Sequence, residues 1–253
     1  MTDKIAKKVM IVTGGGRGIG AAICTAAAAD GYQVCVNYSR SAKAAEAVVA
    51  EIEAKGGTAI AVQADVGVEA DIMRLFQEVD QQLGPVTALI NNAGISYDTP
   101  FADFELSGLR RVLAVNIEGT YIAAREAVRR MAHSHDGKGG VIINISSISS
   151  RSGGGANNVI YASTKGMIDT FTLGLAKEFA KDGVRVCALR PGMTETDIFD
   201  EMGGIEAARA VAAEIVPMGR MARPEEIAAL AVFLCSDAAS YITGLPLDVS
   251  GGR

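Results

Sequence analysis

The stretch KVMIVTGGGRGIG, residues 8–20, decides the fold. An apolar run with β-branched residues predicts a buried strand, and it passes through a glycine-rich turn into an alanine-rich segment that predicts a helix. Gly14, Gly18 and Gly20 allow the backbone to turn sharply and to bring N–H groups at a helix N-terminus close to a pyrophosphate. Their spacing, Gly14-x3-Gly18-x-Gly20, differs from the commonest dinucleotide fingerprint. Taken alone, the turn is equally compatible with a strand–helix connection that binds nothing.

The same alternation of short β-branched runs and longer helical stretches continues along the chain. We predict strands at 8–13, 33–38, 58–65, 87–94, 140–147, 184–191 and 245–250, and helices at 18–30, 41–55, 69–83, 105–132, 157–181 and 224–236. Several strands are apolar throughout, which is typical of parallel strands covered on both faces. With right-handed crossovers, the sequence predicts an α/β, doubly wound Rossmann fold with a seven-stranded parallel sheet flanked by helices. Without repeats or linkers, residues 1–253 are expected to form a single domain.

Composition limits the classes of function. The chain is 49% hydrophobic and 21% charged, which indicates a globular protein with a sizeable core. A formal charge of -5 with scattered basic residues argues against nucleic acid as a partner. No apolar run is long enough for a signal peptide or a membrane span, so we expect a soluble, cytoplasmic protein. The four cysteines are far apart and are expected to be reduced core thiols, and no metal site is predicted.

Residues 193–222 interrupt the alternation after the sixth predicted strand. This segment is too long for an ordinary loop and has helical periodicity of its own. It is either a packed surface excursion or a lid over a site at the carboxyl ends of the strands, where open α/β sheets bind ligands. Its position favours the lid.

The end of the second predicted strand bears on the choice of dinucleotide. An acidic residue there would bind the ribose 2′-hydroxyl of NAD, whereas a cation would accept the 2′-phosphate of NADP. The sequence VNYSRS, residues 36–41, contains no acid, and Arg40 follows the strand. Arg17 projects from the glycine turn, and two guanidinium groups suit one phosphate. NADP(H) is favoured and NAD(H) stays possible, the alternative being that both arginines are solvated surface residues.

Tyr161 and Lys165, in VIYASTKGMID (residues 159–169), lie four residues apart on one face of a predicted helix. Alone, such a pair is usually surface decoration. Here NISS, residues 144–147, ends a strand at the expected ligand edge, so Ser147 and Tyr161 can meet there. A nearby ammonium would lower the phenol pKa from about 10, which suits proton transfer to a carbonyl oxygen.

In order along the chain, Thr13-Gly14-x3-Gly18-x-Gly20, Asn91-Asn92-Ala93-Gly94, Asn116, Ser147, Tyr161-x3-Lys165 and Pro191-Gly192 resemble the motifs of the short-chain dehydrogenase/reductase family. The resemblance covers nearly the whole chain and is greatest to single-domain members such as 3-oxoacyl-acyl-carrier-protein reductases and glucose dehydrogenases. It implies that Asn116, Ser147, Tyr161 and Lys165 are catalytic. Tyr161 would be the general acid/base, Lys165 would lower its pKa and bind the nicotinamide ribose, Ser147 would orient the substrate, and Asn116 would anchor a relay water.

The resemblance also implies two sets of contacts. Asp65 would contact the adenine and Thr196 the nicotinamide carboxamide. The expected cofactor-binding residues are Gly14, Arg17, Gly18, Ile19, Gly20, Tyr38, Ser39, Arg40, Asp65, Val66, Asn92, Ala93, Gly94, Tyr161, Lys165, Pro191, Gly192, Thr194 and Thr196. The expected substrate contacts are Ser147, Ser96, Tyr97, Met193 and Phe199, with the 153–157 loop, Ile198 and Met202 nearby.

The sequence departs from the family pattern at one point. Ser147 and Tyr161 are 14 residues apart, one more than in many relatives, so Ser146 stays open as an alternative catalytic hydroxyl. The Tyr-x3-Lys spacing argues against the enoyl reductase branch, in which the pair is usually separated by six residues. The family also implies a homotetramer.

The resulting expectation is an NADP(H)-dependent oxidoreductase that interconverts a carbonyl and a secondary alcohol, acting on CH–OH donors. The alternative is a non-catalytic NADP(H)-binding redox sensor on the same fold. Sugars, acyl thioesters and small ketones all remain possible substrates.

Overall fold

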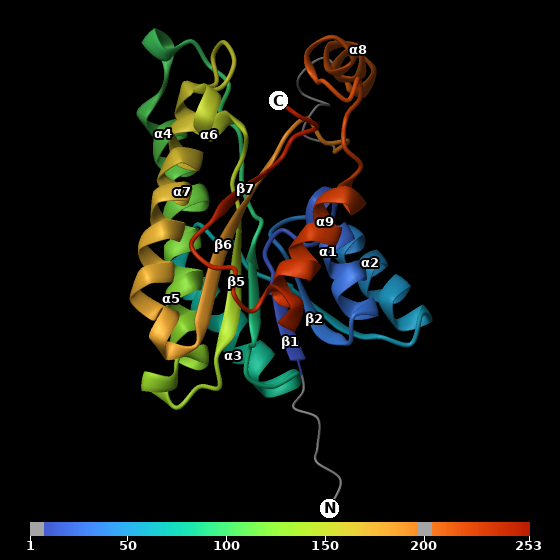
Figure 1. Ribbon diagram of the computed structural model, residues 1–253, viewed down its shortest axis with the longest axis vertical. Helices are drawn as coiled ribbons and strands as arrows, with labels where there is room; N and C mark the ends of the chain where they lie inside the picture. Colours follow the sequence, from blue (N-terminus) through green and yellow to red (C-terminus); the bar gives the residue numbers. More distant parts are fainter. Residues whose placement is uncertain (1–7, 197–203) are drawn as a thin grey trace, which may run out of the picture.

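A computed structural model of the chain describes residues 8–196 and 204–253. Its centre is a seven-stranded sheet in which every pair of neighbouring strands is parallel, in the order β3-β2-β1-β4-β5-β6-β7 (Figure 1). The strands are β1 Lys8–Val12, β2 Tyr32–Tyr38, β3 Thr58–Gln63, β4 Ala88–Asn91, β5 Gly140–Ile145, β6 Val184–Pro191 and β7 Pro246–Val249. The predicted doubly wound Rossmann sheet is confirmed.

Helices cover both faces of this sheet (Figure 1). On one face, α1 (Gly18–Ala29), α2 (Ala42–Ala54) and α9 (Pro224–Cys235) enclose an apolar cluster with the strands. On the other face, α3 (Glu69–Gln82), α5 (Gly119–Met131) and α7 (Val159–Phe179) enclose a second cluster. The sheet is therefore buried on both sides, which explains why its strands are apolar throughout. The remaining helices are α4 Leu106–Leu113, the short α6 Ser149–Ser152 and α8 Ile205–Ile215.

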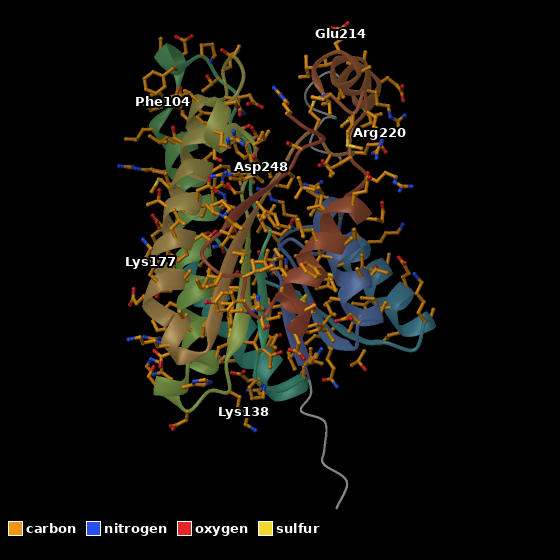
Figure 2. All side chains as sticks on the ribbon, viewed as in Figure 1. Phe104, Lys138, Lys177, Glu214, Arg220 and Asp248 are labelled. Carbon is orange, nitrogen blue, oxygen red and sulfur yellow. The ribbon has the colours of Figure 1, made fainter. Side chains whose placement is uncertain are left out.

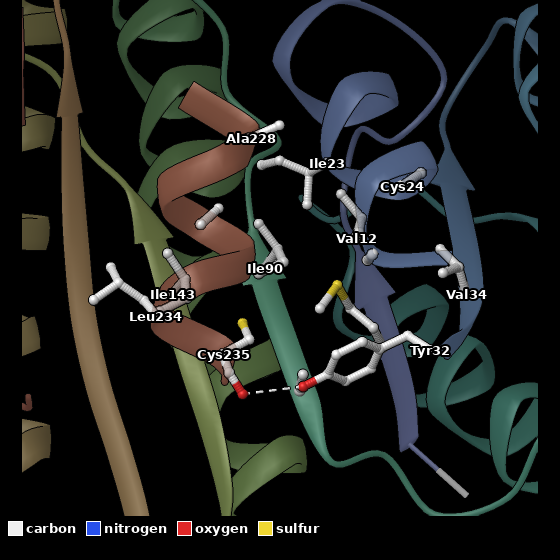
Figure 3. Close-up of a cluster of buried hydrophobic side chains, with 14 of the residues drawn as sticks. Val12, Ile23, Cys24, Tyr32, Val34, Ile90, Ile143, Ala228, Leu234 and Cys235 are labelled. Atoms are coloured by element: carbon white, nitrogen blue, oxygen red, sulfur yellow. Dashed lines mark hydrogen bonds between the residues drawn. The ribbon is translucent and has the colours of Figure 1, made fainter. Parts of the chain in front are cut away.

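Helix α9 and the sheet show how the core is closed. Leu234 of α9 is buried in the same cluster as Ile90 and Ile143 of the neighbouring strands (Figure 3). The Tyr32 hydroxyl donates a 3.2 Å hydrogen bond to the Cys235 carbonyl, which satisfies the last turn of α9. All four cysteines are free and buried, as predicted, and burial raises the pKa of Cys235 to about 12. They are therefore structural residues.

Three predicted boundaries are wrong for related reasons. The helix predicted at 105–132 is interrupted by a π-helical segment, Ala114–Glu118, between α4 and α5. Strands predicted to reach residues 94 and 147 end at Asn91 and Ile145. Asn116 in the π-helical segment, Asn92 after β4 and Ser146 after β5 each make side-chain hydrogen bonds to another segment of the chain, and sequence propensity does not register those bonds.

The segment predicted as a lid leaves the sheet and returns to the same place. Thr194 pairs with Ala222 in an isolated bridge, and the Ala222 amide donates to the Met193 carbonyl at 2.8 Å. Between them, α8 packs over a small apolar cluster that includes Ala212 and Met221, and it stands apart from the sheet in Figure 1. Residues 197–203, which include Ile198, Phe199 and Met202, lie outside the described residues. The lid therefore stays a prediction, as does the single domain.

None of the helices in the described ranges is long and apolar enough to cross a membrane.

Candidate active site

The glycine turn after β1 is tied to the end of β2. The Gly14 amide donates to the Asn37 side-chain oxygen at 3.2 Å, and the Gly15 amide donates to the Asn37 carbonyl at 2.8 Å. Asn37 is buried and its amide nitrogen donates to the carbonyls of Val62 and Ala64. Asn37 therefore joins three strand ends and shapes the turn, a role that its place in the sequence did not reveal.

The turn needs glycine at the predicted positions. Gly14 and Gly18 have φ angles of 63° and 52°, in the left-handed region that favours glycine. A Cβ on Gly20 would lie 2.6 Å from the Asn92 side-chain nitrogen and closer still to the Gly14 carbonyl oxygen. A Cβ on Gly18 would lie 3.0 Å from the Thr196 methyl group. The backbone of the glycine turn thus carries no side chains at these positions and packs closely against its neighbours. This geometry fits a pyrophosphate bound at the N-terminus of α1.

The residues after β4 support this turn from behind. The Asn92 side chain donates to the carbonyls of Thr13 and Gly14 at 2.9 and 3.1 Å. The backbone amides of Asn92 and Ala93 both donate to the Thr13 hydroxyl at 3.0 Å. Thr13, Asn92 and Ala93 are therefore brought together with the turn.

Ser147, Tyr161 and Lys165 also meet at this edge. Ser147 follows β5, and Tyr161 and Lys165 lie on one face of α7. A hydrogen bond from the neighbouring Ser147 side chain lowers the pKa of the Tyr161 phenol, although burial raises it more strongly. The Lys165 Nζ atom donates to the Ile145 carbonyl at 2.7 Å and lies 5.6 Å from the Tyr161 ring centroid. The sequence prediction that these three side chains converge agrees with this geometry.

The pKa of Tyr161 differs in direction from the sequence-based expectation. It is raised above its usual value, first by burial and then by the negative charge of Asp98. Lys165 lies over the ring and gives its hydrogen bond to a carbonyl, and the desolvation of the phenol outweighs the stabilisation that this charge gives to the phenolate. The ammonium is itself desolvated, and burial lowers the pKa of Lys165 to about 8.

Ser146 and Ser147 have different hydrogen-bond partners, which distinguishes their roles. The Ser146 hydroxyl is buried and donates to the Lys165 carbonyl at 3.2 Å, inside the contact between β5 and α7. The Ser147 side chain is the one that reaches Tyr161. The geometry therefore favours Ser147 as the hydroxyl of the site and gives Ser146 a structural role.

Asn116 lies in the π-helical segment and is almost fully buried. Its side chain accepts a hydrogen bond from the Ile95 amide at 2.9 Å and donates to the Ile95 carbonyl and the Thr164 hydroxyl. A Cβ on Gly94 would lie 3.5 Å from Lys165 Nζ and 3.6 Å from Asn116 Oδ1. Asn116 and Lys165 thus approach each other across Gly94, and the bulged helix positions Asn116 there.

Known proteins resemble this chain over nearly its whole length. Residues 14–253 match the family described as Enoyl-(Acyl carrier protein) reductase. A 3-oxoacyl-[acyl-carrier-protein] reductase of Synechocystis is 38% identical over 248 residues, which cover 97% of this chain and 96% of that protein. The 3beta-hydroxysteroid dehydrogenase 1 of Eggerthella lenta is 38% identical over 260 residues, covering 100% and 95%. A crystal structure of a short chain dehydrogenase from Burkholderia cenocepacia in complex with NADP superposes with a TM-score of 0.89, 33% identity and 97% coverage of both chains. The chain belongs to the short-chain dehydrogenase/reductase family.

Near the end of β2 in this short-chain dehydrogenase/reductase, the predicted cofactor residues differ in exposure. Tyr38 is half-buried at the end of β2, whereas Arg17, Ser39 and Arg40 are exposed. Val66, in the turn that follows β3, is buried. The two basic side chains of this predicted set, Arg17 and Arg40, are therefore both at the surface.

Asp65 has a partner that the sequence did not indicate. Both of its carboxylate oxygens accept hydrogen bonds from Arg111 of α4, at 3.0 and 2.8 Å, and one also accepts from the Gly67 amide. Arg111 therefore fixes the carboxylate of Asp65 at the groove. No local sequence pattern indicates this ion pair, because the two residues are 46 positions apart.

The segment after β6 is tied to the ends of β5 and β7 and to the glycine turn. The Ile148 amide donates to the Pro191 carbonyl at 3.0 Å, and the Gly192 amide donates to the Val249 carbonyl at 2.9 Å. Thr194 is buried and donates to the Gly192 carbonyl, while Thr196 touches the glycine turn at Gly18. Ile19, also from that turn, packs against the apolar core.

The predicted substrate residues are only partly brought together. Ser96 donates to Asp98, and Asn158 donates to both side chains, which ties the loop after β4 to the start of α7. The Tyr97 hydroxyl instead accepts from the Glu105 amide at 2.8 Å, with its ring against Gly108 of α4. Met193 packs under α8. Asp98 and Asn158 were not predicted.

Proposed function

We propose that this protein is an NADP(H)-dependent oxidoreductase that interconverts a carbonyl and a secondary alcohol, a reaction on CH–OH donors. The observation that carries the proposal is the convergence of Ser147, Tyr161 and Lys165 beside a glycine turn that leaves its backbone bare. Bound NADPH would supply the hydride, and the chain has to supply the proton and the orientation.

Each side chain has a task that follows from its surroundings. Tyr161 holds its proton because burial raises the phenol pKa, so it is ready to donate that proton as negative charge develops on the carbonyl oxygen. Ser147 hydrogen-bonds the same oxygen and positions it against the phenol. Lys165 carries positive charge into a desolvated region, where it stabilises the phenolate that remains after proton transfer. Asn116 would hold the water through which Lys165 exchanges protons with solvent.

The preference for NADP(H) rests on the charges near the adenosine end of the groove. Asn37 stands at the end of β2, and it is a neutral residue whose side chain is used by the glycine turn. Arg17 and Arg40 are exposed on either side. An NADP phosphate would be attracted by two guanidinium groups and meet no carboxylate at the strand end. The Burkholderia cenocepacia relative with bound NADP supports the same choice.

The reaction is assigned to carbonyl reduction in preference to enoyl reduction. The matched family bears an enoyl reductase description, but Tyr161 and Lys165 are four positions apart on one helix face. The relatives named as a 3-oxoacyl carrier-protein reductase and a hydroxysteroid dehydrogenase are consistent with oxidoreduction at a hydroxyl-bearing carbon. The substrate is a small carbonyl or alcohol compound.

We also propose that the protein assembles as a homotetramer. Along α5 and α7, Tyr121, Met167 and Leu173 are 38%, 43% and 40% exposed, and Tyr121 stacks on Phe171 at 4.0 Å between ring centroids. Near the C-terminus, Tyr241 and Leu245 form a second exposed apolar region. Two separate apolar faces suit two different contacts between copies of the chain.

The deciding experiment measures NADPH oxidation against a panel of aldehydes, ketones, keto sugars and 3-oxoacyl thioesters, with NADPH binding followed by nicotinamide fluorescence. Turnover with at least one saturated carbonyl substrate, and none with enoyl thioesters, is expected. Tight NADPH binding without turnover of any carbonyl would instead favour the non-catalytic redox sensor.

A further inference from the structure

Asp169 lies on α7 four residues after Lys165 and eight after Tyr161. Residues four apart are neighbours on a helix surface, with about 5–6 Å between their Cβ atoms, so the three side chains form one row. Asp169 and Lys165 are both buried, at 8% and 5% exposed. A carboxylate thus continues the row of catalytic side chains into the interior, and the proposed proton transfer does not use it.

The carboxylate of Asp169 is held from the sheet side. Its Oδ2 atom accepts a 2.8 Å hydrogen bond from Nε of Arg190, which lies on β6. Arg190 also pairs with Asp248, its neighbour in register on β7, and Asp248 pairs in turn with Arg151 of α6. Figure 2 shows Asp248 on β7, with α6 and α7 on the same side of the strand. The chain of ion pairs therefore links α7 to the short helix that follows Ser147.

One oxygen of Asp169 is not used by these bonds. Its Oδ1 atom is buried and accepts no hydrogen bond from any residue in the described ranges. A buried carboxylate oxygen without a donor is unfavourable unless positive charge lies nearby. On α7 the nearest basic side chain in sequence is Lys165, one turn away.

The Lys165 ammonium needs such a counter-charge. Its hydrogen-bond acceptor is the neutral Ile145 carbonyl, and Gly94 and the Asn116 amide approach it across the groove. Tyr161 presents its ring. Burial lowers the pKa of Lys165, and the negative charge of Asp169 is the influence that raises it.

We propose that Asp169 is a positioning residue for the reaction, whose carboxylate, anchored by Arg190, is the counter-charge that keeps the buried Lys165 ammonium protonated. The inference rests on the proposed function, because it concerns the proton and cofactor work of Lys165. Asp169 touches neither substrate nor cofactor and acts only through Lys165.

The test is Asp169→Asn, which keeps the shape and the hydrogen bond from Arg190 but removes the charge. The pH dependence of kcat/KM for carbonyl reduction is compared with that of the wild type across the pKa of about 8 for Lys165. We expect the alkaline limb of D169N to move to lower pH, and each pH unit of movement lowers activity on that limb about tenfold. The matched control is Asp80→Asn, which removes the charge from the partly buried Asp80–Arg130 pair between α3 and α5, outside the site. An alkaline limb that moves no further in D169N than in D80N would overturn the proposal.

Two further measurements keep the outcome decisive. In Arg190→Gln the carboxylate loses a positive neighbour, so the alkaline limb should stay or move to higher pH. A merely structural network would move the limb the same way in D169N and R190Q, and this result also refutes the proposal. If D169N does not fold, R190Q alone decides, since a move to lower pH contradicts the charge mechanism.

NADPH affinity measured by fluorescence against pH gives a readout that needs no turnover. It should weaken at lower pH in D169N than in the wild type. An inactive protein with this shift would refute the proposed reaction but retain the role of Asp169.

Discussion

Lys165 Nζ lies 5.6 Å from the Tyr161 ring centroid while it donates to the Ile145 carbonyl at 2.7 Å. The lysine is therefore anchored to the end of β5, and it meets the tyrosine across the face of the ring. In the proposed reaction its charge would act on the phenolate left after proton transfer, while burial raises the pKa of the phenol and keeps it protonated beforehand. In the proposed reaction, Tyr161 therefore keeps its proton before the transfer, and Lys165 stabilises the phenolate after it.

Replacing Tyr161 with Phe should abolish turnover and leave NADPH binding nearly intact. The change removes only the hydroxyl that donates the proton, and the ring stays packed over Lys165. A loss of at least about 10²-fold in kcat is expected from removing the general acid. Steady-state kinetics measures the loss of turnover, and nicotinamide fluorescence measures NADPH binding. Residual activity close to the wild type would mean that another group supplies the proton.

The two neighbouring serines should respond differently to Ala. In Ser147→Ala the substrate oxygen and the Tyr161 phenol lose a hydrogen-bond partner, so kcat should fall steeply with little change in thermal stability. Ser146→Ala removes the bond to the Lys165 carbonyl, which should lower stability by about 1 kcal/mol and spare most of the activity. Kinetics and thermal unfolding of the two variants provide the check. The reverse pattern would assign the catalytic hydroxyl to Ser146.

Lys165 should cost stability at neutral pH. Its pKa is lowered from 10.5 to about 8 on folding, so between these values the unfolded chain binds more protons and the free energy of unfolding due to this residue rises with pH. The change amounts to about 3 kcal/mol, with neutral pH the unfavourable end. Compared with Lys165→Met, the wild type should therefore gain stability as pH rises through this window. The comparison cancels the opposite contribution of the buried cysteines, whose thiol pKa values are raised. Equal pH slopes for the two proteins in chemical denaturation would contradict the buried ammonium.

The exposed apolar residues Met167 and Leu173 of α7 allow a prediction about assembly. Met167→Glu places a charge in the groove formed with Tyr121 and Phe171. If two copies of the chain pack there, burying an unpaired carboxylate should shift the protein toward smaller species in analytical ultracentrifugation. Lys177→Gln, on the same helix but in its last turn, is the control with the same change of net charge. A wild type that sediments as a monomer would exclude the tetramer outright.

The doubly wound parallel sheet and its two covering layers of helices could be predicted from local sequence patterns. The apolar strands, the glycine turn and the Tyr161–Lys165 spacing are all short-range signals, and they led to the sheet and to the convergence at its edge. Asn37, Arg111 and Asp169 could not be found in this way, because each is hydrogen-bonded to a partner more than 20 positions away. The π-helical segment at Asn116 was read as ordinary helix, since its bulge depends on the exchange of hydrogen bonds with Ile95. Polar contacts between distant positions shape the candidate site, whereas hydrophobic periodicity in the sequence indicates only which residues are buried.

The preference between cofactors should lie in Arg40. It is exposed just beyond β2, beside the neutral Asn37 that stands where an acid would bind a ribose hydroxyl. Arg40→Ala should weaken NADPH binding about tenfold or more and leave NADH binding nearly unchanged, because only NADPH carries the 2′-phosphate that the guanidinium would bind. The matched control is Arg129→Ala on α5, which removes an exposed arginine paired with Glu126 of the same helix and should alter the binding of neither cofactor. Fluorescence titration of both cofactors with both variants measures the ratio directly. An equal loss for NADPH and NADH in R40A would show that Arg40 contacts a part common to both cofactors, and the basis for preferring NADP(H) would then move to Arg17.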